Sequence, residues 1–171
     1  MAGTYFLTLI LPKIVGEPTR KSLIDIHWLI SGNLVSTVSK LGGGRNGHLA
    51  LTMNTEDYLY QTAHMFVPPH NPGDLPLQLM GTAQDQALGT ERFQQNQALF
   101  WRCNAVDGGI KKKIIVAVQQ VFLSPIMGQL IGFGQVTSLH MLQNIFRSYG
   151  AIDKINLEEN AVNMMGPYDP A

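Results

Sequence analysis

Apolar side chains recur every three or four residues early in the chain, which is the spacing that places them on one face of an α-helix. Pro18 stands near the start of this stretch and three consecutive glycines follow its end, so we predict a helix over 19–41. Gly32 costs about 1 kcal/mol of helix propensity, which leaves a break at mid-helix open. The predicted apolar stripe consists of Leu23, Ile26, Ile30, Leu34, Val38 and Leu41.

Three shorter elements are expected around this helix. The apolar run over 5–11 has no basic residue before it, so we interpret it as an extended arm or edge strand and not as a signal peptide. Residues 48–53 alternate imperfectly between apolar and polar and predict a short β or extended segment. Thr55 and the two acidic residues after it form a capped, negatively charged first turn, which predicts a short helix over 55–64.

Four of the nine prolines lie between Phe66 and Pro76, where they remove amide donors and prevent regular structure. We therefore divide the chain into three parts. Residues 1–66 hold the N-terminal arm, the long helix and a Gly-rich segment, residues 67–80 form a Pro-rich linker loop, and residues 81–171 form a helical bundle.

The part after the linker has helical spacing to its end. We predict one helix over 82–103, opened by a Thr–Asp capping-box spacing, and a second whose apolar stripe begins at 110 and ends at Ser124-Pro125. Asp107-Gly108-Gly109 predicts a tight turn between these two helices. Further helices are expected over 137–150 and 153–164. Short helices must pack on one another to be stable, so the fold class is mainly α, a small helical bundle with an extended arm.

The charge balance narrows the partner classes. Twelve basic and twelve acidic residues give zero net charge, and only 14% of residues are charged, which disfavours a strongly basic nucleic-acid binder. Weak self-repulsion favours association between copies. No stretch reaches the ~20 apolar residues of a membrane span, and a single cysteine excludes an internal disulfide. We expect a cytoplasmic protein without membrane contact.

Motifs that carry chemistry are absent or lack their context. Gly42, Gly44 and Gly47 have the spacing of a dinucleotide fingerprint, but a helix and not a strand precedes them. The Asp107 tripeptide lacks the Thr or Ser of an aspartic-protease site. The five histidines include no helical i, i+4 pair beside an acid. We therefore predict no enzyme, no cofactor and no metal site, although a triad assembled in space stays open.

Interaction surfaces are the remaining candidates. The one basic run, with a neighbouring arginine, would give weak RNA contact, although a solvated helix face explains it as well. Aromatic or adaptable apolar residues near the two ends suit self-association, or else belong to the intramolecular core. The RNA candidates are Lys111, Lys112, Lys113 and Arg102, and the self-association candidates are Phe6, Leu9, Met164, Met165 and Tyr168.

Several stretches together resemble one known family. They are Gly42-Gly43-Gly44 leading into 47–53, the run 66–73, and Pro167-Tyr168-Asp169-Pro170. From about residue 11 to residue 171 the chain is similar to the Gag (capsid) region of copia-type LTR retrotransposons, especially those of algae, diatoms and oomycetes. The resemblance implies a capsid-like helical fold and an N-terminal portion of a polyprotein. It also implies a structural role, in which copies self-associate into virus-like particles around RNA.

Overall fold

The computed structural model describes residues 9–37, 39, 41, 46–74 and 81–150, and this part of the chain is mainly α-helical with no sheet. Its only strand-like pairs are two isolated bridges, Ser39 with Asn46 and Gly128 with Gly132. The predicted mainly α fold class is confirmed. The elements are α1 (Arg20–Ser36), η2 (Gly47–Leu51), α2 (Thr55–Thr62), α3 (Ala83–Ala117), α4 (Gln120–Leu123), η3 (Ser124–Ile126) and α5 (Ser138–Tyr149).

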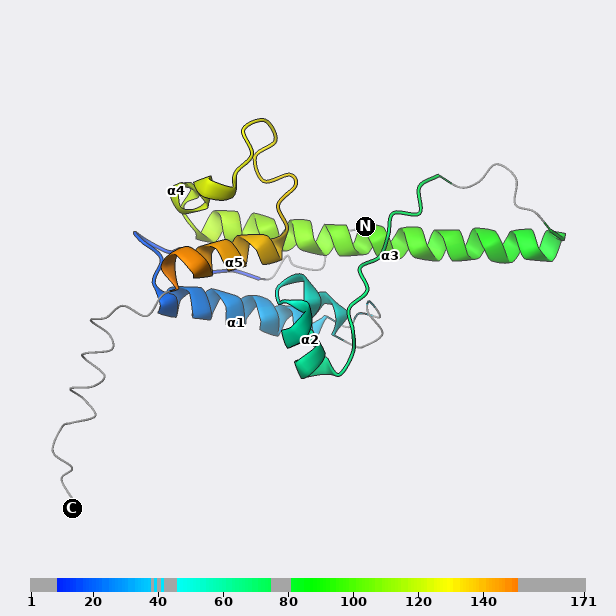
Figure 1. The fold of residues 1–171 in the computed structure, drawn as a ribbon, viewed down its shortest axis with the longest axis horizontal. Helices are drawn as coiled ribbons and strands as arrows, with labels where there is room; N and C mark the ends of the chain where they lie inside the picture. Colours follow the sequence, from blue (N-terminus) through cyan, green and yellow to red (C-terminus); the bar gives the residue numbers. More distant parts are fainter. Residues whose placement is uncertain (1–8, 38, 40, 42–45, 75–80, 151–171) are drawn as a thin grey trace, which may run out of the picture.

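Helix α5 is the centre of the packing. It contacts α1 on one side and α3 on the other (Figure 1), α4 also packs on it, and η3 packs on α4. The 3-10 helix η2 fills the space between α1 and α3. The most deeply buried apolar side chains come from the facing stripes of the three long helices, and they include Ile26, Ile30, Leu34, Ile110, Ile114, Met141 and Ile145.

The α1 stripe is confirmed at its first four positions, all of which are buried, and Gly32 does not break the helix. The helix ends at Ser36, earlier than the predicted 41, because Thr37 turns to an extended conformation. The hydroxyls of Ser36 and Thr37 both donate to the Asn33 carbonyl, which satisfies an acceptor left open at the helix end. Leu41 is nevertheless buried, so the stripe continues beyond the helix.

The predicted strand over 48–53 is wrong. These residues lie mostly in η2, where the amide of Leu49 donates to Asn46 and the amide of Thr52 donates to Leu49, at 2.9 and 3.1 Å. A strand is stable only beside partner strands, and the described residues form no sheet here. The imperfect alternation comes instead from a tight turn of helix whose side chains are buried among α1, α2 and α3.

Helix α2 is confirmed, with a cap one residue earlier than predicted. The Asn54 side-chain oxygen accepts the amide of Asp57 at 2.7 Å, so Thr55 is the first helical residue and not the cap. Ala63 ends the helix in a left-handed conformation, with φ 56°. The helix therefore stops just before the predicted residue 64.

Helix α3 corrects the sequence prediction most strongly. It is a single 35-residue helix that continues through Asp107-Gly108-Gly109, where a turn was predicted. Its buried stripe runs from Cys103 to Ala117 and packs on α5 across the glycines, which offsets their low helix propensity. Asp107 also ties the two helices together, because its carboxylate accepts the Ser138 amide at 2.9 Å and its carbonyl accepts the Ser138 hydroxyl at 3.0 Å.

The end of α3 is also earlier than predicted. Val118 is extended, and the Ala117 carbonyl accepts the amide of Ile14 from the N-terminal arm at 2.8 Å. The arm thus occupies an acceptor that a longer helix would use internally. The chain then forms α4 and η3, with Pro125 in the first turn of η3.

The first half of α3 projects from the bundle (Figure 1). A helix of 35 residues is about 52 Å long, yet its first buried residue is Cys103. Over 83–101 the charged residues are Asp85, Glu91 and Arg92. Such a helix has few ion pairs available to stabilise it in water.

The C-terminal side of the described chain follows the prediction. Thr137 caps α5 by accepting the amide of His140 at 3.2 Å, and Gly150 follows the last turn. The helix predicted over 153–164 lies outside the described residues. The core cluster draws on residues from both sides of the proline-rich segment. The division at 67–80 therefore stays an interpretation of the chain's composition.

Within the described residues, none of the helices combines the length and the apolarity needed to cross a membrane.

Candidate functional site

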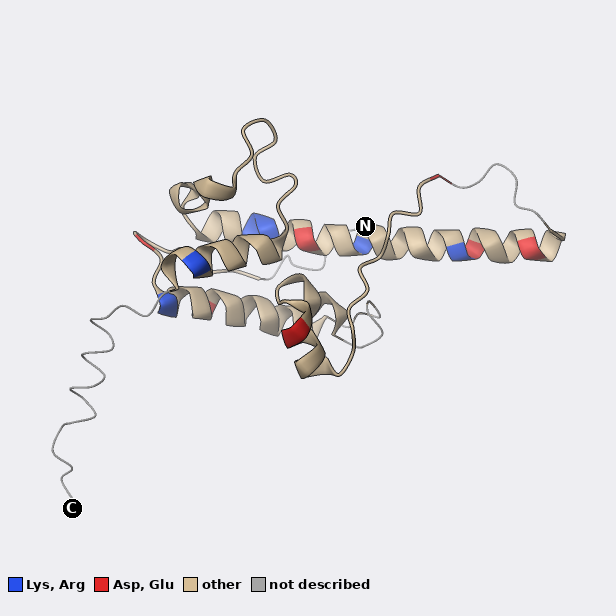
Figure 2. Ribbon diagram, in the orientation of Figure 1, with Lys and Arg blue, Asp and Glu red and all other residues tan. Residues whose placement is uncertain are grey.

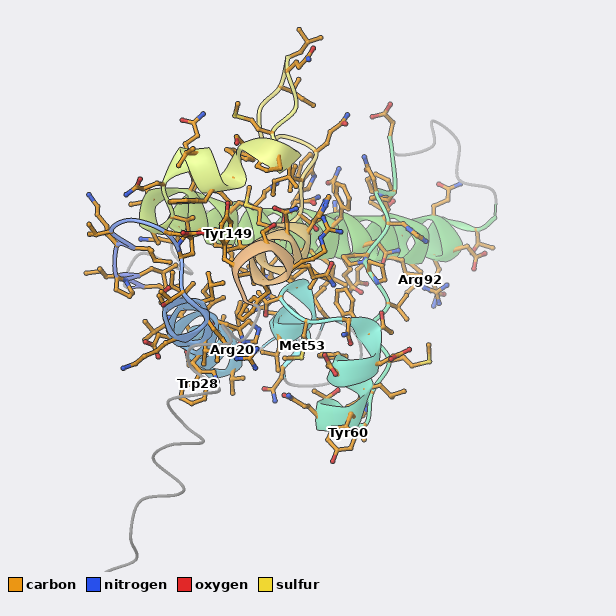
Figure 3. The ribbon with its side chains drawn as sticks, turned by 60° about the vertical axis from the view of Figure 1, so that its left-hand side comes forward. Arg20, Trp28, Met53, Tyr60, Arg92 and Tyr149 are labelled. Atoms are coloured by element: carbon orange, nitrogen blue, oxygen red, sulfur yellow. The ribbon has the colours of Figure 1, made fainter. Side chains whose placement is uncertain are left out.

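A groove of ≈370 Å³ lies where α1, α5 and the segment from Thr52 to Gln61, which includes most of α2, converge. Leu142 and Met53 are buried beneath it, while Trp28 is 71% exposed. Figure 3 shows Trp28 and Met53 on the same side of the molecule. The lining residues are Ile24, His27, Trp28, Thr52, Met53, Asn54, Asp57, Gln61, Leu139, Leu142, Gln143 and Phe146.

Local hydrogen bonds and ring packing fix the walls of the groove. The His27 ring meets the Phe146 ring edge to face, with centroids 6.1 Å apart, and so joins α1 to α5. The Thr52 hydroxyl donates to the Leu49 carbonyl at 3.1 Å. Asn54 is held by its capping bond to Asp57. The groove is therefore built from residues that are already positioned by their own elements.

The chemistry of the lining favours apolar binding. Its single carboxylate, Asp57, and its single imidazole, His27, are accompanied mainly by aliphatic, aromatic and amide side chains. In the described part of the chain, no group of three His, Cys, Asp or Glu side chains is placed to hold a metal ion. A mostly apolar concavity with a few polar groups is typical of a binding site for an apolar side chain or ligand.

A second feature is the tight loop over 128–132. Gly128 and Gly132 bond to each other twice, each amide donating to the other's carbonyl at 2.9 and 3.0 Å. Gly132 has φ +55°, a conformation that favours glycine. These bonds hold Leu130 and Ile131 at the tip, and Leu130 is 97% exposed.

The loop belongs to an uncharged part of the surface. Residues 114–146 contain no Lys, Arg, Asp or Glu, and Figure 2 shows α4 and the loop without acidic or basic residues. Large apolar side chains are exposed along it, including Val116, Val121, Met127, Leu130 and Ile131. Clustered exposed apolar side chains commonly mark an interaction surface. The sequence carried this signal in its charge-free run, which our sequence analysis missed.

The predicted RNA residues do not form one basic face. Lys111 lies 3.4 Å from the Asp107 carboxylate, a bond within the same helix. Lys112 is exposed and Lys113 half-buried. Successive helical residues point in directions about 100° apart, so the three lysines diverge around α3. Arg102 is exposed more than two turns away along the helix.

The predicted self-association residues lie mostly outside the described residues. The structure does not describe Phe6, Met164, Met165 or Tyr168. Leu9 is described and is buried in the core of its own chain, which is the intramolecular alternative left open above.

His48 is a buried residue that sequence reasoning did not single out. It lies in η2 fully shielded from solvent, and within the described structure neither ring nitrogen makes a hydrogen bond of good geometry. Burial lowers the pKa of His48, and the positive charge of Arg102 lowers it further, while the Thr37 backbone acts in the opposite direction. Burial therefore favours the neutral form of the ring.

Cys103 is poorly suited to act as a nucleophile. Burial, together with the negative charge of Asp107, raises the pKa of its thiol to about 11. The nucleophilic thiolate is therefore scarce at neutral pH.

Comparisons with known proteins add nothing to this geometry: no protein family, curated protein or solved structure matches the chain.

Proposed function

We propose that this chain is a structural protein whose copies associate with one another, in the manner of a Gag capsid segment. The observation that carries the proposal is the charge-free stretch over 114–146, within which several large apolar side chains are exposed. Exposing such side chains to water is unfavourable, by about 25 cal/mol for each Å². Contact between copies would remove that exposure without having to bury charge.

The projecting half of α3 supports the same role. A solitary helix in water gains little from its own backbone, and over 83–101 it carries few charges to solvate it. Leu88 and Trp101 are exposed along this half. A helix of this kind is stabilised by lying against a partner.

Binding also fits the groove better than catalysis does. Thr52 is the only hydroxyl in the lining, and it is occupied by its bond to Leu49. A nucleophilic mechanism needs an accessible hydroxyl or thiol beside a base. We therefore propose that the protein acts without an enzymatic activity of its own.

Static light scattering tests the proposed function. The average mass should rise with protein concentration, in the absence of RNA, and should not fall when salt is raised, since salt screens charges but does not weaken apolar contact. A constant monomer mass up to high micromolar concentration, with and without RNA, would exclude self-association as the function.

The alternative proposal is a nucleic-acid-binding module that uses Lys111, Lys112, Lys113 and Arg102. Its support is weaker, because the lysines diverge around α3 and Lys111 pairs with Asp107. It predicts an RNA affinity that falls steeply with salt and is lost when the three lysines are replaced by alanine. RNA binding that survives this replacement would remove the alternative.

A further inference from the structure

We propose that the Leu130–Ile131 tip of one copy inserts into the groove between α1, α2 and α5 of a second copy. The inference rests on the proposed self-association and names the two surfaces that would meet. The tip is the most exposed apolar feature of the described chain, and the groove is a concavity that no described side chain fills.

The two surfaces match in chemistry. The tip and its surroundings carry no charge, so the incoming loop brings no ion that must lose its water. The one carboxylate of the groove, Asp57, is exposed to solvent in the single chain. The groove presents Met53, Leu142 and Phe146, which are suited to aliphatic side chains. Its amides, Gln61 and Gln143, can take the polar backbone of an incoming loop without leaving a charge unpaired.

The two surfaces also match in size. A volume of ≈370 Å³ corresponds to about a dozen water-sized groups. Leu130 and Ile131 together fit in this space, whereas a whole helix does not. The loop is held by its paired Gly128 and Gly132 bonds, so little conformational freedom is lost when the tip is bound.

Their placement dictates contact between different copies. In Figure 3 the 128–132 loop extends from the end of the molecule opposite Trp28 and Met53. A chain therefore cannot put its own tip into its own groove. A tip and a groove on different faces make a heterologous contact, which repeats from copy to copy into rings or open filaments.

One such contact buries much less than the ~1,600 Å² of a standard interface. Each step of assembly is therefore weak, and particles grow only at high concentration or where other surfaces join in.

The experiment uses a tip variant, a groove variant and a control variant of the full chain, each checked for a wild-type helical content by circular dichroism. Leu130→Ser with Ile131→Ser removes the tip but keeps the groove. The groove variant, Gln143→Trp, fills the groove from the exposed side of α5 and keeps the tip. If Gln143→Trp fails to fold, Gln61→Trp fills the groove from α2 instead. Val15→Ser is the matched control, since Val15 is 90% exposed outside both surfaces.

Sedimentation velocity is then measured on each protein and on an equimolar mixture of the tip and groove variants. We expect the tip and groove variants to sediment as smaller species than the wild type, with Val15→Ser unchanged. In the mixture each variant supplies the surface that the other lacks, so a dimer should appear that neither variant forms alone at the same total concentration.

Three results would overturn the inference in distinguishable ways. A wild type that stays monomeric removes the proposed function together with the inference. A wild type that assembles while both variants assemble equally well keeps self-association but removes this contact. Variants that both fail to assemble and form no dimer on mixing show that the tip and the groove take part in separate contacts and do not bind each other.

Discussion

Replacing Gly108 by alanine separates the two interpretations of the segment 107–109. In the structure Gly108 lies inside α3 with a helical backbone, and a Cβ added there meets no atom within 4 Å. Alanine favours a helix interior over glycine by about 0.8–1.0 kcal/mol. Because the added methyl group meets no steric clash that would offset this gain, Gly108→Ala should stabilise the protein by about 1 kcal/mol.

The turn predicted from the sequence gives the opposite sign. Replacing a glycine at positive φ by alanine destabilises the protein by about 1 kcal/mol. The changes in unfolding free energy expected from the two interpretations therefore differ by about 2 kcal/mol. Urea denaturation followed by circular dichroism at 222 nm resolves such a difference. In a thermal scan the stabilisation corresponds to a rise in Tm of about 2–4 °C for a chain of this size.

Two other glycines calibrate the measurement. Gly32 lies in α1 with nothing near its added Cβ, so Gly32→Ala should give a similar gain. Gly16 has equal space but φ +83°, so Gly16→Ala should be destabilising. If Gly108→Ala behaves like Gly16→Ala, the continuous helix is refuted.

Three further predictions concern the core and its buried groups. Ile110→Ala, at a fully buried site, should cost 2–5 kcal/mol in urea denaturation, whereas Leu88→Ala on the projecting half should change stability by less than about 0.5 kcal/mol; similar losses would contradict the projection. Because the folded pKa of His48 lies below its ordinary 6.5, the unfolded state binds more protons and stability should fall as pH drops below about 6.5. His48→Gln should lose less stability than the wild type over that range, and parallel pH profiles would argue against a buried neutral ring. Cys103, with its pKa raised to about 11, should react with a chromogenic disulfide reagent at pH 8 only as fast as the protein unfolds, and immediate reaction would show that the thiol is open.

The sequence predicted those features of the fold that depend on neighbouring residues. The apolar stripe of α1 and the capping threonines of α3 and α5 are local signals, and all are confirmed. The glycines at 108 and 109 also carry a local signal, which was overridden by the contact of α3 with α5 and by the burial of Ile110 and Ile114 in the core. Local spacing cannot report such a long-range contact.

The candidate site was harder to predict than the fold. The groove combines side chains from α1, α2 and α5, and no spacing within one of these helices indicates that the three converge. The exposure of Leu130 and Ile131 likewise depends on the Gly128–Gly132 bonds that lift the tip from the surface. The lack of charge over 114–146 was the one part of the site that could have been read from the sequence.

Sedimentation velocity of the unmodified chain over a wide concentration range, at low and at high salt and without nucleic acid, tests the central claim most directly. Association through uncharged apolar surfaces predicts a weight-average sedimentation coefficient that climbs with concentration and is undiminished by salt. A coefficient that stays at the monomer value throughout would contradict the claim.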